Sequence, residues 1–183
     1  MADTDFYVPD GKRHRLVTAY QNHMDMPGAV LEPYTENGLG IRNSGRPNSF
    51  ESGGAGLFST LDDYRLFADM LMRGGIAENG RRILRSGTVR YLTGGRLSGE
   101  PQKWFERSSG LAGHSYGNLN RVMVNPGCAS TIGHAGEYGW DGLLGVYYAN
   151  DPEAHQTMLL MLNQKDFATN RLTRQLRNIV NSE

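Results

Sequence analysis

Residues 136–152 read Gly136-Glu-Tyr-Gly-Trp-Asp-Gly-Leu-Leu-Gly-Val-Tyr-Tyr-Ala-Asn-Asp-Pro152. The first half of this stretch is rich in glycine, and residues 143–149 have the β-branched and aromatic content of a strand. The Asn-Asp-Pro end predicts that the strand stops there, because proline cannot donate to a strand ladder and Asn or Asp favours a turn. A strand that begins in glycines indicates either a bulge or the close approach of a ligand or a second chain segment.

Two further strands are predicted, one on each side of this stretch. Residues 116–124 have the pattern of a strand, and residues 157–162 are apolar almost throughout, as expected of a strand covered on both faces. The short polar connection before 157 suits an antiparallel hairpin. A final helix over 168–181 is expected to pack on the sheet through one apolar side, formed by Leu172, Leu176, Ile179 and Val180.

The helix that begins near Ser59 and Thr60 has clear signals at both ends. Ser and Thr are good N-caps, the helix dipole favours the two aspartates of the first turn, and Ser59-x-x-Asp62 has the spacing of a capping arrangement. Gly74-Gly75 end the helix. Its apolar face is predicted to consist of Leu61, Tyr64, Ala68 and Leu71.

The rest of the chain is predicted to hold two short helices and two irregular segments. One helix is expected over 10–22 behind an Asp10 cap and another over 86–93, whereas 23–51 and 94–113 lack sustained periodicity. Helices followed by strands and a closing helix favour the α+β class, with an antiparallel sheet flanked by helices.

The composition is that of a soluble globular protein. The sequence does not indicate its cellular compartment. Nineteen basic and nineteen acidic residues give a net charge of zero, which argues against a nucleic-acid or membrane-surface partner. No apolar run approaches the ~20 residues that a membrane-spanning helix needs. The single cysteine, Cys128, excludes an internal disulfide, and the five histidines lack metal-site spacing, so no metal or other cofactor is expected.

Three segments resemble conserved blocks of the serine β-lactamase-like hydrolases, a family of class C β-lactamases, D-alanyl-D-alanine peptidases and esterases. Trp140-Asp141-Gly142 is similar to the third block of that family, which is Lys-Thr-Gly, His-x-Gly or Trp-Gly-Gly, and Asp151-Pro152 follow at the expected distance. Ser52-Gly-Gly-Ala-Gly-Leu-Phe-Ser-Thr-Leu-Asp-Asp-Tyr64 resembles a Gly-Gly-x-Gly-Leu-x-Ser-Thr block, and Asp3-Thr-Asp-Phe-Tyr-Val-Pro9 is a weaker match. The three segments occur in the order of the family.

The resemblance implies the C-terminal portion of the β-lactamase/transpeptidase-like fold, in which the third block lines the active site. Gly142 would then let substrate approach the backbone. The Leu143 N–H would donate to an oxyanion, and such a donor typically lowers the activation barrier by ~3 kcal/mol. Trp140 in place of Lys favours an esterase-type pocket over recognition of a β-lactam carboxylate. Asp141 replaces a small residue and would repel an anionic substrate. His134 and Tyr138 are expected at the rim of the site.

The nucleophile of the family, the serine of a Ser-x-x-Lys motif, has no counterpart in this sequence, so no catalytic residue is assigned in this chain. The resemblance therefore implies that residues 1–183 form one partial domain, that the N-terminal part with the nucleophile helix and any signal peptide lies upstream, and that this polypeptide is inactive alone. The substrate of the full enzyme would be a small ester, amide or β-lactam. The alternative is a non-catalytic module that pairs with itself or with a separate N-terminal half, because a cut sheet and an uncovered apolar face favour association.

A second motif, Gly113-His-Ser-Tyr-Gly117, matches the Gly-x-Ser-x-Gly nucleophile elbow of α/β-hydrolases, with Asp151 and His155 following in triad order. The elbow needs a buried strand before Ser115 and a helix after it, whereas the preceding residues are polar and the following ones resemble a strand. An α/β-hydrolase with Ser115 as nucleophile is therefore the least favoured interpretation. His134 also belongs to a His-x-Gly triplet, but it lies six residues too far from Asp151-Pro152 to be the third block.

Overall fold

An antiparallel sheet of five strands lies at the centre of the computed structural model, which describes residues 1–22, 30–34, 50–165 and 168–182. The strands follow the order β3-β4-β5-β6-β7, so strands that are neighbours in the chain are also neighbours in the sheet. Short connections favour this sequential pairing. The strands are β3 His114–Tyr116, β4 Arg121–Met123, β5 Tyr138–Asp141, β6 Tyr147–Asp151 and β7 Gln156–Leu160.

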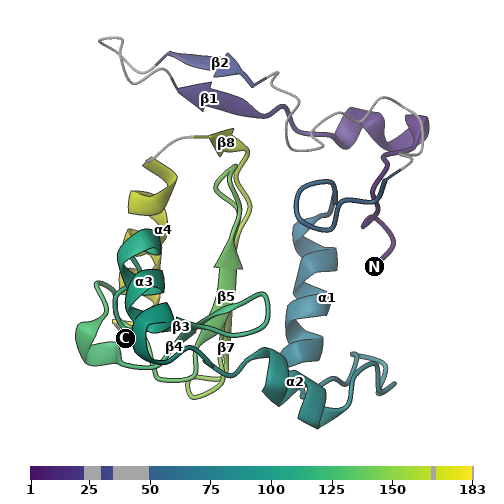
Figure 1. Cartoon of the computed structure of the whole chain (residues 1–183). Helices are drawn as coiled ribbons and strands as arrows, with labels where there is room; N and C mark the ends of the chain where they lie inside the picture. Colours follow the sequence, from purple (N-terminus) through teal and green to yellow (C-terminus); the bar gives the residue numbers. More distant parts are fainter. Residues whose placement is uncertain (23–29, 35–49, 166–167, 183) are drawn as a thin grey trace.

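Helices cover both faces of this sheet (Figure 1). Successive side chains of a strand point to opposite faces, so Tyr148 joins the cluster under α1 (Leu61–Met72), whereas Tyr147 joins the cluster under α4 (Ala168–Val180). The first cluster contains Ala68, Met70, Leu71, Val89, Val122, Tyr138 and Tyr148, and the second contains Tyr147, Ala149 and Met158 with Leu176 and Val180 packed against it. The predicted α+β fold, with an antiparallel sheet flanked by helices, is confirmed.

The start of α1 differs from the predicted capping arrangement by one position. Thr60 is the N-cap, and its hydroxyl oxygen accepts a hydrogen bond from the Asp63 N–H at 3.3 Å. The Ser59-x-x-Asp62 arrangement was therefore wrong. Packing fixes this register, because Ala68 is fully buried on the sheet whereas Leu61, expected on the same face, is 50% exposed at the end of the helix.

The Asp63 carboxylate fastens the N-terminal segment to α1. It accepts hydrogen bonds from the Ala2 N–H at 3.1 Å, the Asp3 N–H at 2.7 Å and the Thr4 hydroxyl at 3.0 Å. Burial opposes ionisation of Asp63, but these donors outweigh it and hold the pKa of the carboxyl below its ordinary value. The first turn of α1 thereby fixes residues 2–4.

Two helices, α2 and α3, lie between α1 and β3, and only the first of these was predicted. α2 spans Ser86–Leu92, close to the expected 86–93. α3 spans Gly99–Ser109 inside the segment expected to be a loop, so that prediction was wrong. Phe105 is the one buried residue of α3, and its ring lies 5.8 Å from the ring of Tyr116. One buried side chain leaves little apolar periodicity in the sequence, which is why α3 was not recognised.

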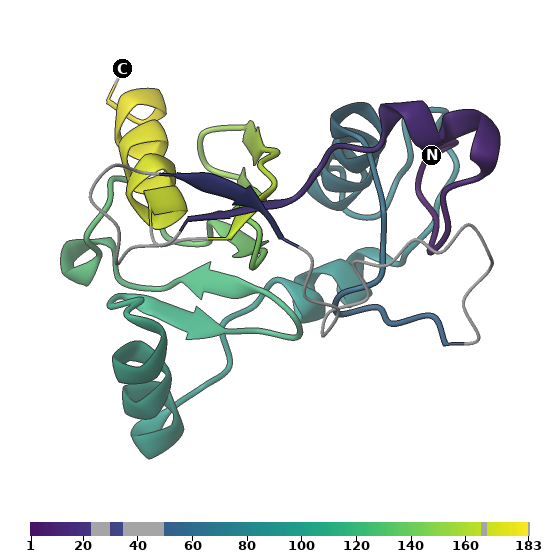
Figure 2. The same ribbon diagram turned by 90° about the horizontal axis from the view of Figure 1, so that it is seen from above.

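The helix predicted over 10–22 is also wrong. A short 3₁₀ helix, η1, covers Asp10–Arg15, and the chain then becomes extended and forms β1 (Tyr20–Asn22). β1 pairs with β2 (Leu31–Pro33) and, in parallel, with β8 (Gln164–Lys165), so strand pairing with a distant segment overrides the local preference. This smaller sheet crosses one end of the larger one (Figures 1 and 2). A second 3₁₀ turn, η2, spans Pro126–Cys128.

Two segments that were predicted as continuous strands each contain part of a hairpin turn. The segment 116–124 contains the β3–β4 turn, closed by a hydrogen bond from the Gly117 N–H to the Asn120 carbonyl at 2.8 Å. The segment 143–149 begins in the β5–β6 turn, and β6 starts only at Tyr147. Gly145 has φ +82°, a left-handed conformation that ends any strand geometry before β6.

The closing helix was predicted within one residue of its observed end, but its apolar side is narrower than expected. Leu176 and Val180 pack on the sheet, whereas Leu172 and Ile179 are 45% and 68% exposed. Most of the irregular segment predicted over 23–51 lies outside the described residues. Among the residues that are described, every helix is too short or too polar to cross a membrane.

Candidate active site

The β5–β6 hairpin holds the triplet on which the resemblance rests. The Gly142 N–H donates to the Val146 carbonyl at 2.7 Å, and the Gly145 N–H donates to the Gly142 carbonyl at 2.9 Å. Within the described part of the chain, these turn bonds leave the Leu143 N–H without a backbone acceptor. A backbone N–H that is fixed by a tight turn and not used by it is suited to stabilise a developing oxyanion.

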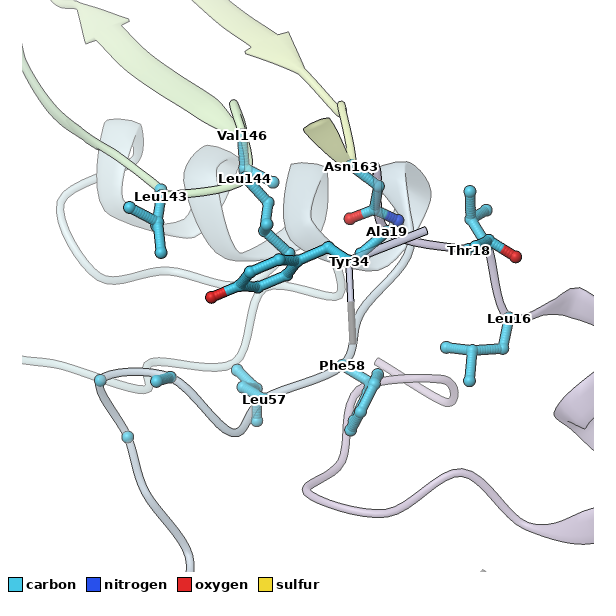
Figure 3. Close-up of a pocket in the computed structure, with 15 residues that line it drawn as sticks. Leu16, Thr18, Ala19, Tyr34, Leu57, Phe58, Leu143, Leu144, Val146 and Asn163 are labelled. Atoms are coloured by element: carbon cyan, nitrogen blue, oxygen red, sulfur yellow. The ribbon is translucent and has the colours of Figure 1, made fainter. Parts of the chain in front are cut away.

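A cavity of about 480 Å³ opens beside this turn. Figure 3 shows Leu143 and Leu144 on one side of it, Leu57 and Phe58 on another, and the Tyr34 ring between them. The remaining lining residues come from the segment that precedes β1, the second block, the β5–β6 turn and the segment before β8: Leu16, Val17, Thr18, Ala19, Gly53, Gly54, Ala55, Gly142, Val146 and Asn163. Segments that lie far apart in the sequence therefore meet at this cavity.

The second resembling block forms a tight turn at the cavity wall. The Ser52 carbonyl accepts hydrogen bonds from the Ala55 N–H at 3.2 Å and the Gly56 N–H at 2.8 Å. No atom of the described residues lies within 4 Å of a Cβ built at Gly53 or Gly54, so this turn presents open backbone to the cavity. Beyond the turn, Phe58 forms an antiparallel bridge with Asp5, which joins the first and second blocks.

The cavity is apolar, and Tyr34 is its one titratable lining residue among those described. The Lys165 ammonium lies 4.5 Å from the centre of the Tyr34 ring and 3.4 Å from its hydroxyl oxygen. Neither residue was predicted from the sequence, because Tyr34 belongs to a segment without periodicity and only the β1–β8 pairing brings Lys165 close. The cavity can bind an apolar group and donate hydrogen bonds, but its described residues include no serine nucleophile with a base.

The other residues of the third block lie away from this cavity. Trp140 is 42% exposed, and its ring packs edge-on against Tyr116 at 5.4 Å between centroids. The Asp141 carboxylate points to the other face of the sheet and accepts a hydrogen bond from Arg121 at 3.1 Å. Gly142 and Leu143 therefore line the cavity, whereas Trp140 and Asp141 do not.

His134 and Tyr138, which were expected at the rim, do not line the cavity. Tyr138 is only 3% exposed and belongs to the core, where its hydroxyl accepts a hydrogen bond from the Asn150 amide at 3.0 Å. The His134 Nδ1 lies 2.7 Å from the Asp151 carboxylate. This hydrogen bond raises the pKa of His134, and the negative charge of Asp151 raises it further, by a smaller amount. The pair fastens the segment before β5 to the end of β6.

Ser115 is in no position to act as an elbow nucleophile. It lies within β3 and is 2% exposed, and its hydroxyl oxygen accepts a hydrogen bond from the Leu97 N–H at 3.2 Å. A second strand, β4, follows it where the elbow would need a helix. The α/β-hydrolase interpretation was therefore wrong. Among the described residues, no three His, Cys, Asp or Glu side chains gather as metal ligands.

The family model described as Beta-lactamase matches residues 1–181. The chain belongs to the Beta-lactamase family. This match confirms the resemblance to the serine β-lactamase-like hydrolases. Two relatives from Mycobacterium tuberculosis, "Protein Rv1367c" of strain ATCC 25618 / H37Rv and "Uncharacterized protein MT1414" of strain CDC 1551 / Oshkosh, are each 29% identical to it over 168 residues. The match covers 88% of this Beta-lactamase family chain and 39% of each relative.

Solved structures agree on the fold. The chain is similar to the unliganded selenomethionyl form of "Simvastatin Synthase (LovD)" from Aspergillus terreus, with a TM-score of 0.76 and 15% identity over 98% of this chain and 46% of that one. It is also similar to "EstCE1, a hydrolase with promiscuous acyltransferase activity", with a TM-score of 0.75 and 22% identity over 97% of this chain and 46% of that one. At these identities the likeness shows the fold alone, which is that of the Beta-lactamase family. It carries no conclusion about chemistry.

Proposed function

We propose that this chain contributes the oxyanion-binding turn and the substrate-lining wall to a serine hydrolase of the Beta-lactamase family. The whole enzyme acylates a serine with a small ester, amide or β-lactam and then transfers the acyl group to water. Gly142 and Leu143 supply the backbone beside the substrate, and the Leu143 N–H donates to the oxyanion of the tetrahedral intermediate.

One observation carries this proposal: the second and third resembling blocks meet at one apolar cavity. Gly53 and Gly54 leave backbone open on one wall, and Leu143 carries an N–H without a backbone acceptor in the described part of the other wall. The apolar lining favours an uncharged acyl group over a carboxylate. These features support an esterase-type substrate in particular.

The nucleophile in this proposal comes from residues outside these 183, because the sequence holds no Ser-x-x-Lys motif. Residues 1–183 alone are then inactive. The test is the intact mass of the purified chain after incubation with a p-nitrophenyl ester or a penicillin, beside a gel that counts polypeptides. The mass of this chain is expected to stay unchanged. If a second polypeptide with Ser-x-x-Lys is present, the acyl adduct is expected on that polypeptide, and a stoichiometric adduct on residues 1–183 would overturn the proposal.

We further propose that the chain functions in association with such an N-terminal half, or with a second copy of itself. In the described sheet, β7 pairs on one side with β6 and its other edge is unpaired, and an open edge favours the addition of a strand. Light scattering across a range of protein concentrations tests this. A monomer at every concentration, with no partner in the gel, would count against association.

A further inference from the structure

A second cavity, of about 250 Å³, lies on the other side of the β5–β6 hairpin from the candidate active site. The hairpin, α4 and the segment that follows α3 enclose it. Gly142 and Val146 line both cavities, so the hairpin is their common wall. The proposed hydrolase chemistry uses no side chain of this second cavity.

Three arginines, Arg121, Arg174 and Arg177, line the second cavity together with one carboxylate, that of Asp141. Asp141 pairs with Arg121, and Glu137, which lies outside the lining, pairs with Arg177 at 2.7 Å. Arg121 is almost fully buried and donates to the Asp141 carboxylate at 3.1 Å and to the Tyr148 carbonyl at 3.3 Å. A guanidinium has five N–H donors, so these two contacts leave further donors for a ligand.

Three polar atoms of the lining residues are buried without a hydrogen-bond partner in the described structure. They are His114 Nε2, the Tyr147 hydroxyl and Arg177 Nε. All three residues are at least nine-tenths buried. Leaving such an atom unsatisfied is costly, so native proteins place these groups where a partner is available. All three atoms are therefore available to a ligand in the cavity.

His114 narrows the chemistry of that ligand. Its Nδ1 lies 3.1 Å from the Ala112 carbonyl, which can only accept, so Nδ1 carries the proton. Burial, with the nearby Arg121 and Arg177 charges, lowers the pKa of His114 to about 4. The ring is then neutral near pH 7, and Nε2 is an acceptor. The ligand must therefore offer oxygens to the guanidinium groups and a hydroxyl to His114.

We propose that this cavity binds a small oxyanion that carries a hydroxyl group, either a phosphate or a short hydroxycarboxylate. The oxyanion accepts hydrogen bonds from Arg174, Arg177 and the Tyr147 hydroxyl, and its own hydroxyl donates to His114 Nε2. This site is independent of the proposed hydrolase function, since it requires no nucleophile and no substrate in the neighbouring cavity.

The test is calorimetric titration of the full chain near pH 7, at constant ionic strength, with two matched pairs of anions. Phosphate carries a hydroxyl at this pH and sulfate does not, and glycolate carries a hydroxyl that acetate lacks. Saturable binding with a stoichiometry of one is expected for phosphate or glycolate, at least fivefold tighter than for the matched anion. The pair that binds identifies the source of the oxyanion. Equal affinities within both pairs, or no saturable binding, would overturn the proposal.

Two variants locate the site. Arg174→Gln removes an exposed guanidinium of α4 and is expected to weaken binding at least tenfold, whereas Arg171→Gln, on the same helix but outside the cavity, is expected to stay within twofold. Tyr147→Phe removes a hydroxyl that has no hydrogen-bond partner among the described residues, so thermal stability is expected to hold while affinity falls about fivefold. Equal weakening by Arg171→Gln and Arg174→Gln would show diffuse charge attraction and would overturn the site.

Discussion

The Arg177 guanidinium lies 2.7 Å from the Glu137 carboxylate, and both side chains are almost completely buried. The pair joins the closing helix α4 to the residue just before β5. Arg177 also reaches the Ile132 carbonyl, so one side chain of α4 holds the segment that leads into the candidate site. The position of β5 thus depends on a residue that follows it by about forty positions.

Breaking this pair on one side is expected to be costly. Arg177→Met leaves the Glu137 carboxylate buried without its partner, and the free energy of unfolding should fall by about 3–5 kcal/mol. The double variant Glu137→Leu with Arg177→Met should recover part of that loss, because no charge remains buried. Urea denaturation measures both, with Arg171→Met on the exposed side of α4 as a control expected within ~0.5 kcal/mol. A single variant as stable as the control would contradict this role.

Gly139 allows β5 and β6 to pair closely. A Cβ at this position would overlap the Tyr148 carbonyl and lie 2.8 Å from the Ala149 Cα, both on the paired strand. Gly139→Ala is therefore expected to lower the free energy of unfolding by about 3 kcal/mol or more. Gly54→Ala is the matched control, because its Cβ meets no described atom within 4 Å, and it should change stability by less than ~0.5 kcal/mol. Similar thermal melts for both variants would refute the close approach.

Local signals were sufficient to predict the fold class, α2 and the extents of α1 and α4. Each of these helices has turn or cap residues at its ends or enough apolar positions on one side. Gly142, selected from the resembling glycine blocks, lies beside a cavity, and its role toward substrate stays a prediction. Such signals extend over only a few residues, so they can be recognised without knowledge of the tertiary structure.

The remaining features depend on partners that no local pattern reveals. Leu143 and Leu144 favour a strand by composition, yet the pairing of β5 with β6 places them in the turn. Asp141 was expected to face substrate, but its partner is Arg121 on β4, twenty residues earlier. Tyr34 reaches the cavity because β2 pairs with β1, which in turn pairs with β8. In each case strand pairing between distant segments decided the outcome, as tertiary context commonly does.

The Asp63 carboxylate predicts how acid releases the N-terminal segment. Its folded pKa lies below the ordinary 3.8, so it adds stability above pH 3.8, and that stability is lost as pH falls through the lowered value. Asp63→Asn should reduce the stability of the chain at pH 7 and reduce the protection of the Asp3 amide against hydrogen exchange by at least fivefold. Unchanged protection at Asp3 would show that the carboxylate does not hold this segment.

The His134–Asp151 pair predicts the opposite pH dependence. The Asp151 carboxylate holds the pKa of His134 above its ordinary 6.5, so the pair stabilises the fold fully below pH 6.5 and loses that effect as pH rises through the folded pKa. Asp151 stays bound to the N–H groups of Glu153 and Ala154 when His134 is neutral, so the turn after β6 should persist.

The measurement is an NMR titration of the His134 ring, together with urea denaturation at pH 5.5 and 8.5. Wild type is expected to be more stable relative to His134→Asn at pH 5.5 than at pH 8.5. Asp151→Asn keeps an acceptor oxygen but removes the charge, so the pKa of His134 should fall toward 6.5. If His134 titrates at the same pH in wild type and Asp151→Asn, the charge of Asp151 does not stabilise the imidazolium, and the pair only positions the segment before β5.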